Sequence, residues 1–265
     1  MTTASDAAQT GSRQGGFRQS GRRTAIEVGV VVVGLALAAF GGRSCLGWTA
    51  ERAVDFIPAE ADAQVGAAGA EQFRAQYAAA GSPPADAEAR VQRIFLELVD
   101  ALSADERARL GAPRVTVVVD ETPNAFALPG GEVFVLTGLL ERADDAMLRG
   151  VLAHELGHAV ARHGMRGLAR RAAFGVTLAA LVGEVDGLVL TLTAGASELD
   201  RLAHSRDMES EADAFGVALL DRTGHDPEGL ARFLESLGPQ PIPAWISTHP
   251  EPAARAAEIR ADHDL

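Results

Sequence analysis

Cysteine is nearly absent from this chain of 265 residues, which has only Cys45, and lysine is absent, so arginine supplies all 24 basic side chains. A single cysteine cannot form an internal disulfide, and the fold must therefore be stabilised by its core. A metal site built from several thiolates is excluded too, which leaves histidine and carboxylate ligands. The formal net charge of −12 argues against a general nucleic-acid binder, which needs a basic patch.

Long apolar runs are scarce, and one of them lies close to the N-terminus. Residues 1–23 are polar and contain four arginines, which predicts a flexible basic tail. Residues 24–42 follow with one charged side chain, Glu27. As a helix this run would span roughly 28 Å, close to the hydrocarbon thickness of a bilayer. We predict a single-pass membrane anchor; a cleaved signal peptide with a weak site at Ala36-Leu37-Ala38 and a buried core helix are the alternatives.

The arginines around this run predict its orientation. Four precede it, whereas Arg43 and Arg52 follow it, and positive charge is retained on the cytoplasmic side. The N-terminus is therefore expected in the cytoplasm, and the rest of the chain outside it, at a cell membrane of bacterial type. Residues 43–85 are rich in alanine and glycine and predict a partly helical connector.

The pattern from residue 86 to residue 265 is that of one folded domain. Apolar and charged residues at helical spacing predict helices, among them those over residues 86–102, 146–163 and 205–223. β-Branched or extended runs predict three short strands, over residues 114–120, 124–128 and 132–137. Pro129-Gly130-Gly131 is a turn signal between the last two. We therefore expect a helix-rich α+β domain with a small β-sheet.

The segment His154-Glu155-Leu156-Gly157-His158 has the pattern H-E-x-x-H inside a predicted helix. Residues four apart lie on one helix face, so both imidazoles can bind one metal ion. Glu155 points about 100° away, close enough to hold a water on the metal and act as its general base. The alternative is a pair of exposed histidines on an amphipathic helix.

A catalytic zinc site needs a third protein ligand and an open position. Glu209 and Asp213 lie four apart on a second predicted helix and share a face. One carboxylate could bind zinc while the other accepts the N–H of a ligand histidine. Glu211 competes for the ligand role, although it points about 200° round the helix from Glu209. Alone, an acidic helix face is usually solvent-exposed.

Five segments, in order, resemble the M48 family of metallopeptidases and cover roughly residues 86–262. They are Pro123–Gly131, Val133–Leu140, His154–Gly164, Met208–Asp213 and Ser247–Pro250. The resemblance implies a zincin-like (gluzincin) fold that binds one zinc ion per chain through His154, His158 and Glu209. It also implies that Asp213 supports a ligand from behind, and that the substrates are proteins or peptides.

Three further features are interpreted with the help of this resemblance. The segment Asn124-Ala125-Phe126-Ala127 is expected to present an edge strand to substrate, or else to be a plain hairpin. His249 could donate to a developing oxyanion or occupy the open zinc position, and a surface role is the alternative. Arg255 could bind a carboxylate of the site or of the substrate. The other histidines, which are His163, His204, His225 and His263, have no partner pattern and are interpreted as surface or core residues.

The apolar segment 172–194 is broken by Glu184 and Asp186 and is too short in each half to span a bilayer. We expect core helices that cover the site, with a membrane-touching flap as the alternative. The functional prediction is a zinc-dependent metalloendopeptidase that cleaves proteins near the membrane, in protein quality control. The alternatives are a membrane-tethered binding or chaperone-like module and a prenyl-protein processing enzyme, of which the latter type carries several membrane spans.

Overall fold

The computed structural model describes residues 49–182, 205–237 and 249–263. The predicted tail and anchor, residues 1–23 and 24–42, lie outside these ranges, as does most of the segment 172–194. Within the described ranges, no helix is both long and apolar enough to cross a membrane.

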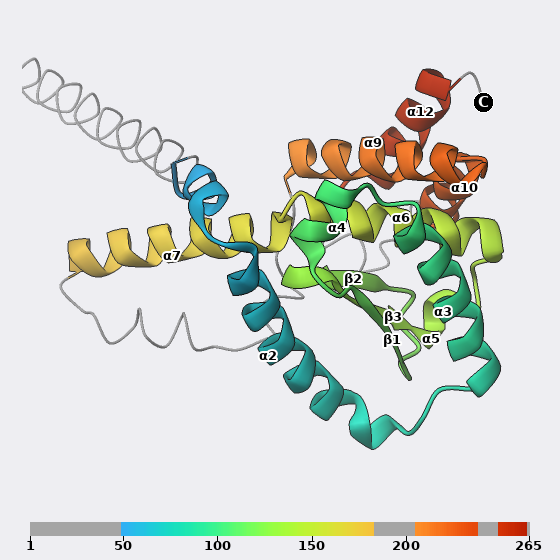
Figure 1. The fold of residues 1–265 in the computed structure, drawn as a ribbon, viewed down its shortest axis with the longest axis horizontal. Helices are drawn as coiled ribbons and strands as arrows, with labels where there is room; N and C mark the ends of the chain where they lie inside the picture. The colour runs from blue at the N-terminus through green and yellow to red at the C-terminus, as the bar shows by residue number, and fades with distance from the viewer. Residues whose placement is uncertain (1–48, 183–204, 238–248, 264–265) are drawn as a thin grey trace, which may run out of the picture. The chain divides into compact units, whose positions relative to one another are not determined.

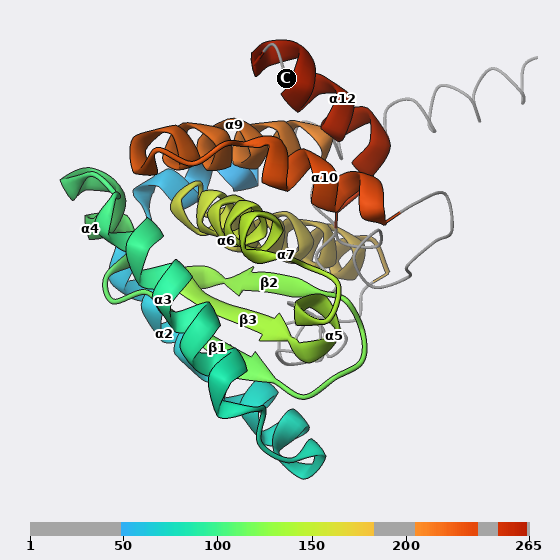
Figure 2. The same cartoon turned by 90° about the vertical axis from the view of Figure 1, so that its right-hand side faces the viewer.

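A three-stranded mixed sheet forms the centre of the domain (Figures 1 and 2). Its strands are β1 (Arg114–Val118), β2 (Ala125–Leu128) and β3 (Glu132–Leu136), in the order β1-β3-β2. Strand β1 runs parallel to β3, whereas β2 pairs antiparallel with it across the short 3-10 turn η3 (Pro129–Gly131). The turn contains Gly130 at φ 76°, a left-handed conformation that glycine adopts without strain. All three predicted strands are present.

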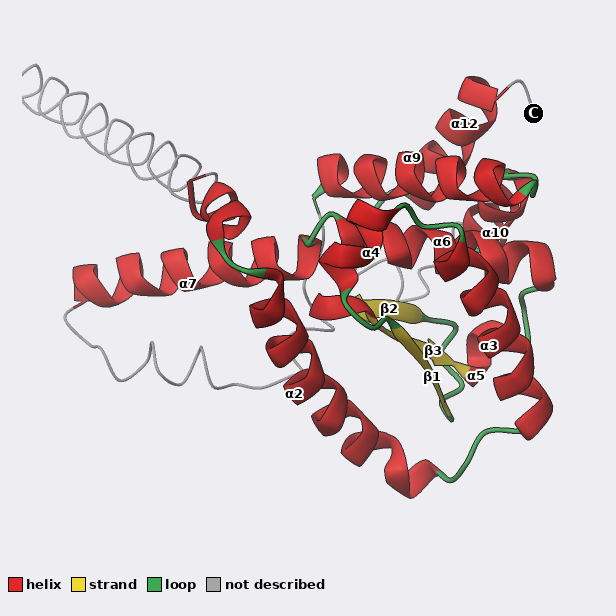
Figure 3. Ribbon diagram, in the orientation of Figure 1, coloured by secondary structure: helices red, strands yellow, loops and turns green. Residues whose placement is uncertain are grey.

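Alternation along β3 places apolar side chains on both faces of the sheet. Val133 and Val135 belong to the main core, which also contains residues of helices α3 (Ala85–Asp100) and α6 (Asp145–Val160). Phe134 and Leu136 belong to a second cluster, in which Phe73 of helix α2 (Ala59–Tyr77) packs against β2 and β3. Helix α2 lies inside the stretch expected as a connector and covers one face of the sheet (Figure 3).

Helix α6 carries the H-E-x-x-H segment and lies between the sheet and helix α9 (Arg206–Thr223) (Figure 2). It begins where the side chain of Asp144 accepts a hydrogen bond from the backbone N–H of Met147, which satisfies a free amide of its first turn. Helices α4 (Ala104–Leu110) and α5 (Thr137–Leu140) are short connections before it. The fold is thus a helix-rich α+β domain with a small sheet, as predicted.

The predicted helix over residues 146–163 is in fact two helices, and this corrects the expectation. Helix α6 ends at Val160, and α7 (His163–Val182) begins after a corner at Arg162. Arg162 has φ 59°, a left-handed conformation that interrupts the α-helix. The residues at the corner, Ala161 and Arg162, are neither glycine nor proline, so local sequence signals did not predict it.

Helix α9 packs along α6, and helices α10 (Glu228–Ser236) and α12 (Pro252–His263) also contribute residues to the main core. Gly157 lets the two backbones touch, because a Cβ atom there would lie 2.8 Å from the carbonyl oxygen of Ala212. Gly224 ends α9 in a left-handed conformation at φ 73°, directly after the predicted end of this helix at residue 223. This close packing brings the predicted ligands on two separate helices to one place.

Candidate metal centre

Four buried side chains from three segments meet beside α6. His154 and His158 come from α6, Glu209 from the first turn of α9, and His249 from the segment just before α12. Each offers one ligand atom, and all four atoms lie within 4.8 Å of one another. The structure therefore brings together the three predicted zinc ligands and adds His249 to them.

The separations between these atoms fit one small ion. Ligand atoms that lie about 2.0 to 2.1 Å from a tetrahedrally coordinated zinc ion are about 3.3 Å apart from each other. The Nε2 atoms of His154 and His158 are 3.0 Å apart, and Nε2 of His158 lies 3.3 Å from Oε1 of Glu209. Nε2 of His154 lies 3.6 Å from Oε2 of Glu209. Two imidazoles and a carboxylate are also a ligand set that zinc prefers.

Glu155 lies next to this cluster and belongs to a different face of α6. Its side chain is 1% exposed, and Oε1 has no hydrogen-bond partner. Nε2 of His249 lies 3.5 Å from Oε1. Burial raises the pKa of Glu155, and the charges of His249 and His154 and the backbone of Ala127 oppose this shift only in part. A buried carboxylate oxygen without a partner is a site where a proton or a water can be held.

Asp213 and Arg255 lie behind the predicted ligands. Oδ1 of Asp213 lies 2.9 Å from Nδ1 of His154, and Arg255 donates two hydrogen bonds of 2.7 Å to the same carboxylate. Nη1 of Arg255 also lies 2.5 Å from Oε2 of Glu209. Burial alone would raise the pKa of Asp213, but the hydrogen bond from Arg255 and the charge of His154 hold it below its usual value.

Glu209 is also held in its ionised form by neighbouring charges and hydrogen bonds. It is 1% exposed, and burial by itself would raise its pKa. The charge of His249 and the hydrogen bonds from His158 and His249 outweigh burial and hold the pKa of Glu209 far below its usual value. The site therefore offers an anionic oxygen to a cation in the same place as two imidazole nitrogens.

Strand β2 is the edge of the sheet nearest α6 (Figure 2). Asn124, just before β2, is 3% exposed, and its Oδ1 has no hydrogen-bond partner. Ala125 and Ala127 face the main core with α6, whereas the side chain of Phe126 packs on the other face against Phe73, with 4.9 Å between ring centroids. Within the predicted substrate segment Asn124-Ala125-Phe126-Ala127, Phe126 can therefore contact substrate only through its backbone.

His163 is the residue at this centre that sequence reasoning missed. It is fully buried; its Nδ1 lies 2.8 Å from Nδ1 of His158, and its Nε2 lies 3.1 Å from Oε2 of Glu211. If α6 had continued to residue 163, His163 would point about 140° away from His158. The corner at Arg162 removes this obstacle, and no pattern in the sequence indicated the corner.

The remaining candidates lie elsewhere. Glu211, the competing ligand, is bound to His163 and has a side chain that is 53% exposed. His225 pairs with Glu97 outside the cluster, and His204 lies outside the described residues.

Comparisons with known proteins identify relatives of this chain. The chain is 39% identical over 147 residues to mitochondrial metalloendopeptidase OMA1 of Arabidopsis thaliana, which covers 54% of this chain and 30% of that protein. It is 31% identical over 191 residues to the Saccharomyces cerevisiae protein of the same name, with 63% of this chain and 53% of that protein covered.

The bacterial beta-barrel assembly-enhancing protease of Escherichia coli is 32% identical over 153 residues, with 52% of this chain and 31% of that protein covered. The chain thus spans about a third to a half of the length of these curated relatives. Residues 85–263 match the model of peptidase family M48. The chain belongs to peptidase family M48.

Proposed function

We propose that this chain is a zinc-dependent metalloendopeptidase that hydrolyses peptide bonds of proteins at or near a membrane. One observation carries the proposal: a buried carboxylate, Glu155, with an unpartnered oxygen stands beside three buried ligands of the type that zinc binds. Membership of a peptidase family supports the same reaction. A purely structural zinc site would have no use for a base at this position.

His154, His158 and Glu209 would hold one zinc ion per chain. A zinc ion bound there would act as a Lewis acid, lowering the pKa of a water molecule and polarising the scissile carbonyl. Asp213 would keep the proton of His154 on Nδ1, which leaves Nε2 free as a ligand. Arg255 would hold both carboxylates, Asp213 and Glu209, in the ionised form that this arrangement needs.

Glu155 would act as the general base. It takes a proton from the attacking water, whose oxygen bonds to the carbonyl carbon, and passes that proton to the amide nitrogen as the carbon–nitrogen bond breaks. Burial raises its pKa, and a base that holds its proton more readily is better matched to both transfers near neutral pH.

His249 would serve as a fourth ligand in a resting state of the site. Its Nδ1 lies 3.4 Å from Nε2 of His154 and 3.1 Å from Oε2 of Glu209, so it stands among the ligand atoms. In this position it would occupy the place that substrate or water needs. Once displaced, the same imidazole would be close enough to donate to the developing oxyanion.

Substrate would be held along β2, the edge strand beside the cluster. Backbone pairing to an edge strand selects little for sequence, which suits a protease with many protein substrates. Oδ1 of Asn124, buried and without a partner, would accept an N–H of the bound peptide. Arg255 would not contact the substrate, because Asp213 and Glu209 already engage its guanidinium.

The setting of this activity is proposed from the sequence and from the relatives. Residues 24–42 would anchor the chain in the membrane, with the N-terminus in the cytoplasm and the catalytic domain outside it. The relatives are named as a mitochondrial metalloendopeptidase and a beta-barrel assembly-enhancing protease, which supports a role in protein quality control.

The test is casein hydrolysis by the full chain in detergent micelles, with zinc content measured on the same samples. We expect the wild type to bind one zinc and cut casein, and Glu155→Gln to bind zinc but cut about 100-fold more slowly or worse. Tight zinc binding without hydrolysis, and no effect of Glu155→Gln, would instead indicate a zinc-containing binding or chaperone-like module.

A further inference from the structure

Both ring nitrogens of His158 are engaged, and the reaction proposed above uses only one of them. Nε2 faces Oε1 of Glu209 at 3.3 Å, where the metal ion would lie. Nδ1 lies 2.8 Å from Nδ1 of His163. His158 is 2% exposed and His163 is not exposed at all, so no solvent competes for this hydrogen bond. A histidine that binds zinc through one nitrogen usually donates the other N–H to a protein group that fixes its orientation.

If Nε2 of His158 binds a metal ion, only one arrangement of protons fits the contact between the neutral rings of His158 and His163. Nε2 of His158 must carry no proton if it is to bind a metal ion, so the proton of His158 is on Nδ1, which donates to His163. Nδ1 of His163 must then accept, and the proton of His163 is on Nε2. That nitrogen lies 3.1 Å from Oε2 of Glu211, an acceptor that completes the chain.

The arrangement behind His158 parallels the one behind His154. Nδ1 of His154 contacts Asp213, which Arg255 holds; Nδ1 of His158 contacts His163, which contacts Glu211, and Arg166 donates to Glu211 at 3.3 Å. Both carboxylates lie on α9, at two and four residues after Glu209. Helix α9 therefore supplies Glu209 and both of these carboxylates, of which Asp213 contacts His154 directly and Glu211 contacts His158 only through His163 of α7.

The corner between α6 and α7 is what places His163 under His158. Arg162 adopts φ 59° and is held there by four hydrogen bonds from its guanidinium. Two go to the carboxylate of Asp62, which is 1% exposed, and the others go to the carbonyls of Val54 and Ile57. A left-handed conformation at a non-glycine residue costs energy and persists when surrounding contacts impose it. These contacts impose the corner, and the corner returns His163 to the metal centre.

We infer that His163, backed by Glu211, is a positioning residue for the zinc ligand His158: it accepts the Nδ1–H of that ligand and fixes its ring so that Nε2 faces the metal ion. This inference rests on the proposed function, because it assigns a role toward a bound zinc ion. It gives His163 no contact with substrate. Glu211, the competing ligand in the sequence, acts here through His163 rather than on the metal.

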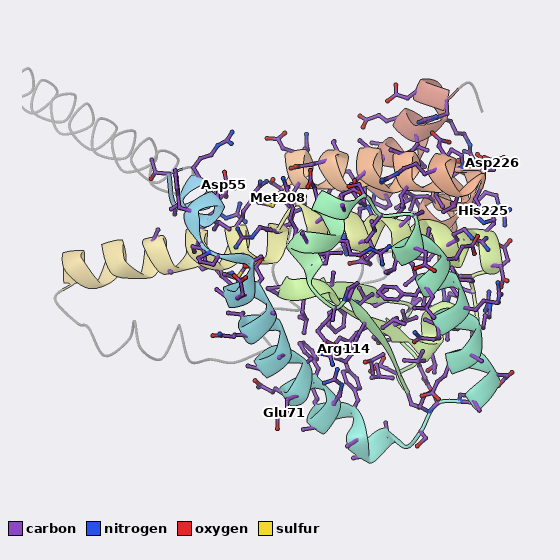
Figure 4. All side chains as sticks on the ribbon, viewed as in Figure 1. Asp55, Glu71, Arg114, Met208, His225 and Asp226 are labelled. Atoms are coloured by element: carbon purple, nitrogen blue, oxygen red, sulfur yellow. The ribbon has the colours of Figure 1, made fainter. Side chains whose placement is uncertain are left out.

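The test uses the full chain in detergent micelles and four variants. His163→Leu removes the acceptor and keeps an apolar volume, whereas His163→Asn places an amide oxygen close to where Nδ1 stands. Glu211→Ala removes the end of the hydrogen-bonded chain at a half-exposed position. His225→Leu is the matched control, because it also breaks a histidine–glutamate pair, with Glu97, outside the metal cluster. Figure 4 shows His225 just beyond the last turn of α9, whereas Met208 lies in its first turn next to Glu209.

Three measurements are made: zinc affinity by competition with a chelator, the visible absorption spectrum of the cobalt-substituted protein, and the steady-state kinetics (kcat and KM) of a peptide substrate. We expect His163→Leu to weaken zinc binding about 10- to 100-fold and to change the cobalt spectrum. His163→Asn should recover most of the affinity and lower kcat less. Glu211→Ala should weaken zinc binding several-fold, and His225→Leu should not change it.

Zinc affinity and a cobalt spectrum like those of the wild type in His163→Leu would overturn the inference. Equal losses in His163→Leu and His163→Asn would overturn it too, because they would indicate packing rather than an acceptor. If His163→Leu does not fold, Glu211→Ala tests the inference instead. An unchanged zinc affinity in Glu211→Ala would overturn the role of Glu211 behind His163. If the wild type binds zinc but cuts no substrate, the proposed peptidase function fails. The zinc affinities and cobalt spectra still test the role of His163 in that case.

Discussion

Asp213 accepts from Nδ1 of His154 at 2.9 Å, on α9 one turn after Glu209, whose carboxylate faces Nε2 of the same ring. The imidazole is thus held on both sides by residues of one helix. Helices α9 and α6 are in close backbone contact at Gly157. A shift of α9 would therefore move Glu209 relative to the two histidines of α6. The packing of two helices therefore sets the geometry of the metal centre.

Asp213→Asn is expected to weaken zinc binding about 10- to 100-fold, because the amide cannot serve both His154 and Arg255 as the carboxylate does. Titration with a chelator measures the change. Asp221→Asn, at an exposed position two turns further along α9, is the control and should bind zinc like the wild type. An unchanged affinity in Asp213→Asn would remove its proposed support of His154.

Glu209→Ala and Glu211→Ala separate the ligand from its competitor. Glu209 lies among the ligand atoms, whereas Glu211 contacts His163. We expect Glu209→Ala to lose bound zinc after gel filtration, and Glu211→Ala to retain one zinc per chain with lower affinity. Metal analysis by mass spectrometry gives the stoichiometry. Full occupancy in Glu209→Ala together with loss in Glu211→Ala would reverse the two roles.

Local patterns were sufficient to predict the elements that carry the centre. The i, i+4 spacing of His154 and His158 and that of Glu209 and Asp213 are properties of single helices, which sequence shows directly. The strands β1 to β3 were predictable because β-branched runs and the turn at Pro129-Gly130-Gly131 are local signals. That the two helices would lie side by side followed only from chemistry, since one metal ion needs ligands from both.

Long-range contacts were not predictable in this way. Helix α2 is an alanine-rich stretch with few large apolar side chains, yet its Phe73 packs on one face of the sheet. Arg162 adopts its left-handed conformation because of Asp62, which lies 100 residues earlier in the chain. His163 depends on that corner, so its place at the metal centre was hidden as well. Each case is decided by a tertiary contact that overrides local preference.

Gly157→Ala is expected to damage the centre without touching a ligand. The added methyl group would lie 2.8 Å from the carbonyl oxygen of Ala212, which is backbone and cannot rotate away. Helix α9 would have to move, and Glu209 would move with it. We expect weaker zinc binding and a loss of about 1 to 3 kcal/mol in the free energy of unfolding, measured by chemical denaturation.

Gly164→Ala is the comparison for this variant. Its methyl group would meet the ring of Pro129, a side chain, at 3.2 Å, so a smaller loss is expected. Wild-type stability and zinc affinity in Gly157→Ala would show that α6 and α9 can separate without cost.

Arg162→Leu is expected to lower the free energy of unfolding by roughly 3 kcal/mol. The reason is that Asp62, 1% exposed, would keep a buried charge without its partner. Denaturant titration measures the loss. Arg170 on α7 forms a more exposed ion pair with Glu51. Arg170→Leu breaks this pair and should change the free energy of unfolding by less than about 1 kcal/mol. Equal effects of the two substitutions would contradict a special role for the corner.

The start of α6 should make stability depend on pH below about 4. Hydrogen bonds from Arg90 and Arg93, at 2.6 and 2.7 Å, hold the pKa of Asp145 below its ordinary value of 3.8. The backbone N–H of Met147 does the same for Asp144. A carboxyl group whose pKa is lower in the folded chain stabilises the fold above its unfolded pKa, and this stability is lost as the pH falls through the folded pKa.

We therefore expect the melting temperature of the metal-free protein to fall as the pH is lowered from about 5 to about 3. Asp145→Asn cannot titrate, so its melting temperature should start lower and fall less steeply over the same range. Asp86→Asn, an exposed residue at the start of α3, should follow the wild type. Parallel curves for Asp145→Asn and the wild type would mean that the contacts of Asp145 with Arg90 and Arg93 add no stability to the helix that carries His154 and His158.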